Sequence, residues 1–160
     1  MYTPEELFQR WYAEPLKRLE EIPRGDGRFV ALAVSCALYE RFATAILKRS
    51  GVTADKSAKI QRCMQDFDPD EQTARAFWTV VRDGLAHQAM PKHSDWTGDQ
   101  PEWWLHHDYP KAAELADING RTVLKVQPWV FMHKVLGLWH DNLDLLTASR
   151  SFPWGNIVGM

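Results

Sequence analysis

The segment that most constrains the fold is residues 28–50, RFVALAVSCALYERFATAILKRS, which reads as one long helix. Apolar side chains surround most of the helix circumference in its first half, and a helix of that kind has to be enclosed by other elements. Gly51 follows directly, and glycine is the residue that most often lies just past a helix end. We therefore expect this segment to be the central, most buried helix of a mainly α-helical fold.

Helix signals recur on both sides of this segment. Thr3 and Glu6 form the capping-box pattern, with Pro4 in the first helical position, which predicts a helix to about residue 22 with a kink at Pro15. Asp68 is the expected cap of a later helix, because proline and a glutamate in the third position follow it. The later helices are expected over residues 54–65, 69–89 and 128–148.

Residues 113–126, AELADINGRTVLKV, carry strand signals instead, within an insertion expected over about residues 102–127. The pair Asn119-Gly120 suits a tight hairpin turn, whose two central residues both need positive φ. Counting outward from this turn places Leu115 opposite Leu124, which agrees with the hydrophobic pattern. The chain therefore reads as a helical bundle with a small antiparallel β-hairpin inserted before the last helix.

Length and charge limit the class of protein. The 160 residues suit a single domain over residues 1–160 with a substantial core. A formal net charge of −2 provides no overall cationic field, so a large nucleic-acid surface is not indicated. Any phosphate site has to be local.

The two cysteines and the apolar segments indicate the compartment. Cys36 and Cys63 show no metal-ligand spacing and are expected to be free, buried thiols. The first residues are acidic where a signal peptide would be basic, and the apolar run at residues 29–39 is too short to span a bilayer. We expect a cytoplasmic protein with no membrane partner.

One helix carries a polar cluster that packing does not require, within FWTVVRDGLAHQAM at residues 77–90. At 100° per residue, a core face that starts at Phe77 leaves Arg82 on one flank and Asp83 with His87 on the other. Asp83 and His87 are four residues apart, so the carboxylate can orient the imidazole and favour its protonated form. Arg82 adds a planar cation that can hold two phosphate oxygens at once.

Gly84 lies in the middle of this cluster. Glycine is costly inside a helix, which makes sense if a partner helix or a substrate approaches closely there. A purely structural reading also stands: Arg82 and Asp83 would face water, and His87 would offset the helix dipole near the carboxyl end.

Metal-free cleavage of RNA needs a base for the ribose 2′-hydroxyl, an acid for the leaving oxygen and a cation for the transition state. One copy of the helix offers one arginine and one histidine, Arg82 and His87. Two copies related by a two-fold axis would supply two of each. The residues therefore suggest a site that a homodimer completes.

The sequence RDGLAH at residues 82–87 resembles the R-(polar)-x-x-x-H signature of the HEPN superfamily. The whole stretch at residues 77–90 is similar to the late helix of uncharacterised bacterial members, and the order of helices before and after it also resembles that family. The likeness is sharp over about fifteen residues and loose over the rest.

This resemblance implies an up-and-down bundle of four or five helices that dimerises along the motif helix. It implies a composite, metal-independent endoribonuclease site with Arg82 and His87 as the catalytic pair and Asp83 as the polar helper. Many family members act as toxins or in defence against phage, so an antitoxin or defence partner is expected beside RNA. Others are inactive modules that bind nucleotides or proteins. The hairpin is not part of the minimal family pattern.

Other polar residues were weighed as site candidates. Glu40, on the expected central helix, can face the flank of Arg82 or of His87, although an intrahelical pair with neighbouring charges is the alternative. No metal or cofactor is expected, because the remaining histidines complete no ligand set. These are His93, His106, His107, His133 and His140.

Three tryptophans lie in or beside an expected loop over residues 90–104. Trp96, Trp103 and Trp104 can stack on bases, but packing the hairpin against the bundle is the preferred reading.

Two classes of function therefore remain. The first is a ribonuclease, and the second is a catalytically inactive helical dimer that binds nucleotides or a protein.

Overall fold

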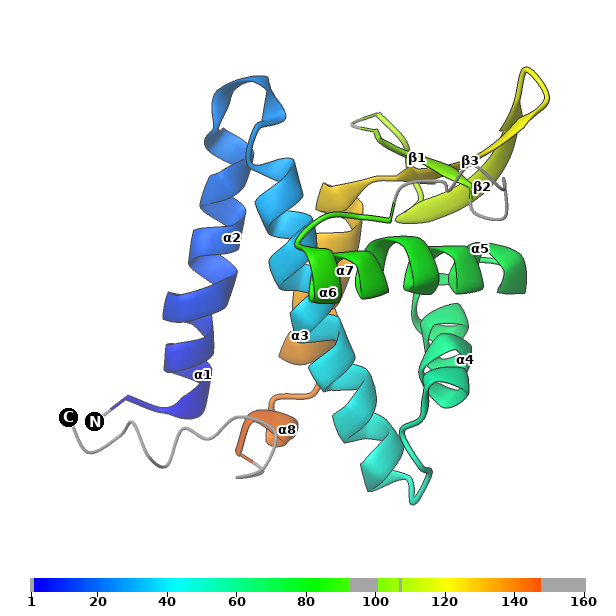
Figure 1. Ribbon diagram of the computed structural model, residues 1–160. Coiled ribbons are helices and arrows are strands. Elements are labelled where there is room, and N and C mark those ends of the chain that lie inside the picture. The colour runs from blue at the N-terminus through cyan, green and yellow to red at the C-terminus, as the bar shows by residue number, and fades with distance from the viewer. Residues whose placement is uncertain (1, 93–100, 107, 148–160) are drawn as a thin grey trace.

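The computed structural model describes residues 2–92, 101–106 and 108–147. The described chain is mainly helical, with a small three-stranded mixed sheet at one end (Figure 1). The long helix α3 (Arg28–Arg49) runs through the middle, with the N-terminal helical stretch on one side (Figure 1). The helix over residues 71–88, called the motif helix because it carries Arg82 and His87, crosses the other side (Figure 1). The expectation of a mainly α-helical protein is confirmed.

The N-terminal helical stretch changes its winding along its length. Its segments are α1 (Pro4–Phe8), η1 (Gln9–Ala13), α2 (Glu14–Arg18) and η2 (Leu19–Glu21). The capping box is formed, because the Thr3 backbone N–H donates to Glu6 Oε2 at 2.7 Å and the Glu6 N–H donates to Thr3 Oγ1 at 3.2 Å. The expected kink at Pro15 takes the form of the π-helical turn η1 just before it, since proline has no N–H for the regular ladder.

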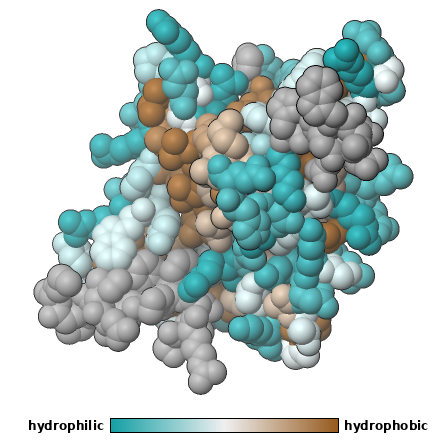
Figure 2. Space-filling view, in the orientation of Figure 1, coloured by the Kyte–Doolittle hydropathy of each residue, from teal (hydrophilic) through white to brown (hydrophobic). Residues whose placement is uncertain are grey.

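Helix α3 (Arg28–Arg49) is the central helix that the sequence predicts. It ends where expected, with Gly51 in the left-handed region at φ +73°. Its inner face packs against α7 (Pro128–His140), where the Trp139 indole donates to the Leu38 carbonyl at 3.2 Å. Part of α3 nevertheless reaches the surface, and hydrophobic residues form a strip between α2 and α6 (Asp83–Gln88) in the region where α3 passes (Figure 2).

Helix α3 is also the one described helix that is long and apolar enough to cross a membrane by length and composition. Half of its most apolar stretch is buried inside the fold. That burial is typical of the core helix of a soluble protein.

The cap of the motif helix differs from the expectation. Helix α4 (Lys56–Phe67) ends at Asp68, which has a left-handed φ of +56° and therefore cannot start the next helix. Asp70 is the N-cap instead, and its side chain accepts from the Thr73 N–H at 2.9 Å. The local sequence DPDEQ offers an aspartate at both positions, and the chain turns between them.

The motif helix itself runs through three segments, α5 (Glu71–Ala76), η4 (Phe77–Arg82) and α6 (Asp83–Gln88). The middle segment is π-helical, and the Asp83 N–H donates to the Trp78 carbonyl five residues back. A π-helical turn holds more residues than an α-helical turn, so the residues that face the core differ from those of a regular α-helix. Trp78 and Val80 are buried as a result, whereas Gln88, which the regular helical arithmetic places on the core side, is exposed.

The strand region is a sheet of order β1-β3-β2. Strands β2 (Ala113–Ile118) and β3 (Arg121–Val126) are antiparallel, with Leu115 opposite Leu124 as the turn residues predict. Strand β1 (Glu102–Leu105) adds to β3 in parallel, which the sequence reading assigned to the end of a loop. The expected hairpin is therefore part of a mixed sheet.

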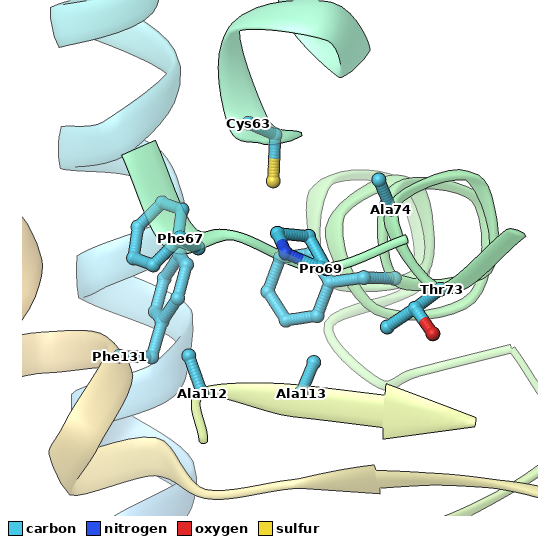
Figure 3. A pocket seen from close by; sticks show the side chains of 9 residues that line it. Cys63, Phe67, Pro69, Thr73, Ala74, Ala112, Ala113 and Phe131 are labelled. Atoms are coloured by element: carbon cyan, nitrogen blue, oxygen red, sulfur yellow. The ribbon is translucent and has the colours of Figure 1, made fainter. Parts of the chain in front are cut away.

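The sheet packs on the helices through β2. The Leu115 N–H donates to Thr73 Oγ1 at 3.1 Å, which ties β2 to α5. A narrow cavity of about 10 Å³ remains at this contact, with Cys63 above it and Ala112 and Ala113, at the start of β2, below (Figure 3). Phe67 and Phe131 close one side of the cavity as a stacked pair with ring centroids 4.8 Å apart. A space of this size holds at most one water molecule.

The last helix is shorter than expected. Helix α7 ends at His140, and α8 (Asp144–Thr147) follows after a turn. The Asn142 side chain donates to the Leu138 carbonyl at 2.8 Å, which replaces a backbone hydrogen bond that a continuous helix would make. The apolar stripe still continues across the break, because Leu145 and Leu146 are buried.

The cap assignment gives a test of the motif helix. Asp70→Ala removes the side-chain acceptor and is expected to lower the free energy of unfolding by about 1 kcal/mol. Asp68→Asn is the matched control, because asparagine tolerates a left-handed φ, and it should change stability little. Urea denaturation of both variants measures this, and an Asp68 effect larger than the Asp70 effect would contradict the assignment.

Candidate functional site

Arg82 lies at the centre of a network of charged side chains from three helices. Arg82 Nε donates to Glu40 Oε2 at 2.9 Å, Nη2 donates to the same oxygen, and Nη1 donates to Asp83 Oδ1 at 2.7 Å. Lys59 binds the other oxygen of Glu40 at 2.9 Å, and Lys56 binds the other oxygen of Asp83 at 2.8 Å. Three cations and two carboxylates leave this network with one positive charge in excess.

The network is only partly open to solvent. The side chains of Arg82, Asp83 and Glu40 are 22%, 14% and 26% exposed. The Arg82 guanidinium also lies over the Trp78 ring, with Cζ 5.8 Å from the ring centroid. Charge-assisted hydrogen bonds and the ring face together fix the orientation of the arginine.

The network shifts the ionisation of its members. Burial alone would raise the pKa of Glu40, but the hydrogen bonds from Arg82 and Lys59 outweigh it and hold that pKa below its usual value. The pKa of Asp83 is lowered in the same way by Lys56 and Arg82, against the effect of its burial. Burial would lower the pKa of Arg82, and the two carboxylates raise it instead. All three groups are therefore charged at neutral pH.

His87 lies outside this network. Its side chain is exposed, and within the part of the chain that the structure describes it has no hydrogen-bond partner. The expected contact with Asp83 is absent among these residues, where the Asp83 carboxylate accepts from Lys56 and Arg82 instead. Five α-helical residues also turn His87 by about 140° from Arg82. One chain therefore presents the arginine and the histidine on different sides of the helix.

Gly84 is explained by the chain itself. A Cβ at this position would lie 2.5 Å from the Lys92 backbone N and 2.6 Å from the Met90 carbonyl oxygen. The segment after the helix folds back across Gly84, and the Lys92 N–H donates to the Val80 carbonyl at 2.8 Å. The close approach that the sequence suggests is real, but neither a partner helix nor a substrate makes it.

A hollow of about 150 Å³ lies beside Arg82, between α3 and α6. Its walls are mostly small and apolar, and Arg82 and Glu40 provide its charged groups. The lining residues are Ala33, Cys36, Ala37, Glu40, Arg82, Leu85 and Ala86.

The sequence pointed to Glu40 as a site residue but not to its neighbours Lys56 and Lys59. Glu40 does face Arg82, and the alternative of an intrahelical pair is wrong, because its partners lie on α4 and on the motif helix. Lys56 and Lys59 were not among the predicted site residues, although they bind Asp83 and Glu40. Their spacing of three residues on α4 was the available signal, since it places both on one face.

The other histidines are dispersed. His133 Nε2 lies 2.6 Å from Glu20 Oε1, and His140 Nδ1 lies 3.3 Å from Asp141 Oδ1. His106 contacts the Tyr109 ring. Among the residues that the structure describes, no three His, Cys, Asp or Glu side chains form a group that could hold a metal ion. His93 and His107 lie outside the described residues.

The tryptophans and cysteines are mainly structural. Trp103 packs against the core, Trp104 is 42% exposed, and Trp96 lies outside the described residues. Cys36 and Cys63 are free and buried, as predicted. Burial raises the pKa of Cys63 to about 12 and also raises that of Cys36, so both remain protonated thiols.

Comparison of the chain with protein-family models, with curated proteins and with solved structures found no match. The geometry of the site therefore carries the functional argument.

The glycine contact gives a second test. Gly84→Ala places a methyl group against backbone atoms and is expected to lower the free energy of unfolding by about 1–3 kcal/mol, despite the better helix propensity of alanine. Gly137→Ala is the control, because a Cβ there meets no atom within 4 Å. It should raise stability by about 0.5–1 kcal/mol. Equal effects of the two substitutions in thermal or urea denaturation would contradict the described backbone approach.

The lowered carboxyl pKa values give a third test. A group whose pKa is lower in the folded state stabilises the fold above its unfolded pKa, and this contribution is lost as the pH falls through the folded value. The network should therefore stabilise the protein at pH 7 and lose its effect below the ordinary values of 4.5 for Glu40 and 3.8 for Asp83.

Glu40→Gln is the variant for this measurement. It should lower the free energy of unfolding at pH 7 by about 1 kcal/mol, and the difference from wild type should shrink as the pH falls through the range below 4.5. Glu71→Gln, which breaks an exposed pair with Arg75, is the control and should cost less than about 0.5 kcal/mol. A Glu40→Gln deficit that is independent of pH would contradict the charged network.

Proposed function

We propose that this chain is a metal-independent endoribonuclease of the HEPN type, with a composite site that a homodimer completes. The observation that carries the proposal is the state of Arg82. It is a fixed, permanently charged guanidinium in a network with one excess positive charge, and an exposed histidine follows it on the same helix. These are the cation and the proton-transfer group that cleavage of RNA requires without a metal.

The chemistry assigns a role to each residue. His87 would remove the proton from the ribose 2′-hydroxyl, whose oxygen attacks the phosphorus as the bond to the 5′-oxygen breaks. A second His87 would protonate that leaving oxygen, which leaves a 2′,3′-cyclic phosphate. Arg82 has five N–H groups, of which three are used by Glu40 and Asp83, so two can bind the charged phosphorane. Asp83 would act as a positioning residue for Arg82, in place of the contact with His87 that the sequence suggests.

A second copy of the chain is part of the proposal. One protomer supplies one His87, and its side chain is exposed and available to a partner. Two exposed apolar residues lie at the N-terminal end of α3 and just after the motif helix. They are Val30, which is 50% exposed, and Met90, which is 51% exposed. The hydrophobic strip between α2 and α6 gives a two-fold partner an apolar surface beside the motif helix (Figure 2).

The finer fold assignment belongs to the same proposal. The N-terminal helical stretch, α3, the motif helix and α7 would correspond to the helices of an up-and-down four-helix bundle. The mixed sheet would be the insertion over residues 102–127. A cytoplasmic role as a toxin or in phage defence, with an antitoxin or defence partner, follows from the resemblance of the motif.

A catalytically inactive helical dimer is the second candidate, and one observation favours it. Glu40 and Asp83 already occupy three N–H groups of Arg82, so a phosphate has to share the guanidinium with two carboxylates. A protein of this kind would bind a nucleotide or a protein without cleaving RNA.

Incubation of the purified protein with total RNA in EDTA tests the proposal. Wild type should cleave, whereas Arg82→Ala and His87→Ala should each lose about 100-fold or more of the rate, because general acid–base catalysis and transition-state cations contribute factors of this size. Arg75→Ala is the matched control, because Arg75 is an exposed arginine on the same helix that pairs only with Glu71 in the described chain. It should cleave like wild type. Intact RNA with wild type, or equal cleavage by all four proteins, would reject the ribonuclease and favour the inactive dimer.

A further inference from the structure

We propose that the hollow beside Arg82 is a binding subsite for a single pyrimidine base, with cytosine preferred. The subsite deepens the proposed function and rests on it for the role of the neighbouring phosphate. The hollow lies between α3 and α6, and Arg82 and Glu40 line it directly. A nucleotide whose phosphate is bound by Arg82 would therefore place its base within reach of this space.

The size of the hollow selects one ring. Its volume is about 150 Å³ and it is open on one side, and an enclosed apolar cavity of about this volume holds one benzene ring. A pyrimidine has one six-membered ring, whereas a purine has two fused rings and needs more room. The space exists because three of the lining residues, Ala33, Ala37 and Ala86, have side chains that end at Cβ.

The walls suit the faces of an aromatic ring. Leu85 and the three alanines offer apolar surface, and ring faces are themselves apolar. The Cys36 thiol, which is buried and protonated, also lines the hollow and brings no charge to it. Hydrogen bonding is therefore concentrated on Glu40 and Arg82.

Glu40 selects the edge of the ring. A carboxylate has about four lone-pair sites, and three hydrogen bonds from Arg82 and Lys59 use three of them. One site remains for an N–H donor of the ligand. Carboxylates accept from the amino group of cytosine, whereas uracil presents a carbonyl oxygen at the same ring position. Lys59 and Arg82 keep Glu40 ionised, so it accepts and does not donate.

Calorimetric titration with the 3′-monophosphates of cytidine, uridine, adenosine and guanosine tests the subsite. All four carry the same phosphate, so their differences report on the base. Cytidine monophosphate should bind at least about tenfold more tightly than either purine nucleotide, which corresponds to one well-formed base contact. Equal or tighter binding of a purine nucleotide, or no binding of any nucleotide, would overturn the proposal.

Two variants locate the binding. Ala37→Leu adds a larger side chain at an exposed position of α3 that lines the hollow, and should reduce the preference for cytidine over adenosine to about one. Lys48→Leu places the same side chain at an exposed position of the same helix that does not line the hollow, and should leave the preference unchanged. Cytidine affinity that Ala37→Leu leaves intact would place the base elsewhere and overturn the proposal.

Glu40→Gln tests the edge contact. An amide presents both a donor and an acceptor, so this variant should bind cytidine and uridine monophosphates about equally. A cytidine preference that survives it would contradict the role of Glu40. The two proposals fail separately. Nucleotide binding that depends on Ala37, without RNA cleavage, would reject the ribonuclease and keep the subsite. RNA cleavage that depends on Arg82 and His87, without a base preference, would reject the subsite and keep the ribonuclease.

Discussion

The ion pair between Arg82 and Glu40 joins the motif helix to the central helix α3, and the rest of the site depends on it. Glu40 accepts two hydrogen bonds from the guanidinium and a third from Lys59 on α4. Asp83 and Lys56 extend the network to the next position of the motif helix and back to α4. Three helices are thereby held at fixed relative positions around one arginine. Breaking one partner of such a network leaves a half-buried charge uncompensated, so the arrangement is maintained as a unit.

The same ion pair determines which hydrogen-bonding groups face a ligand in the hollow. It holds the guanidinium at the edge of the hollow between α3 and α6, where Ala33 and Ala37 leave space. The arginine keeps two N–H groups for an anion, and the carboxylate keeps about one acceptor site for a donor. The cluster is therefore suited to a ligand that carries both a phosphate and a hydrogen-bonding ring. A nucleotide has this combination, and free phosphate lacks the ring.

Much of the fold follows from local rules that the sequence displays. The capping box at Thr3, the stop at Gly51 and the pairing around Asn119-Gly120 each depend on a few neighbouring residues, and each appears in the structure where it was expected. The cap of the motif helix was misplaced by two residues, because Asp68 and Asp70 satisfy the same local rule. Strand β1 was missed because it is defined by its pairing with β3, which is distant in the sequence.

The candidate site was less predictable, because its contacts are tertiary. The sequence singled out Arg82, Asp83 and Glu40, but it could not show that two lysines of α4 close the network. The regular helical angle failed within η4, where a π-helical turn shifts the core face toward Trp78 and Val80. The sequence marks Gly84 as a point of close approach, and the structure shows that the segment ending at Lys92 makes that approach.

The proposed composite site requires a second copy of the chain to bring another His87 to the same site. A spin label at Gln88→Cys tests it directly, because Gln88 is exposed and the two native thiols are buried and protonated. Packed helices lie about 8–10 Å apart, so dipolar spectroscopy should give one short distance between the labels of two protomers. The absence of dipolar coupling at protein concentrations that cleave RNA would contradict the composite site.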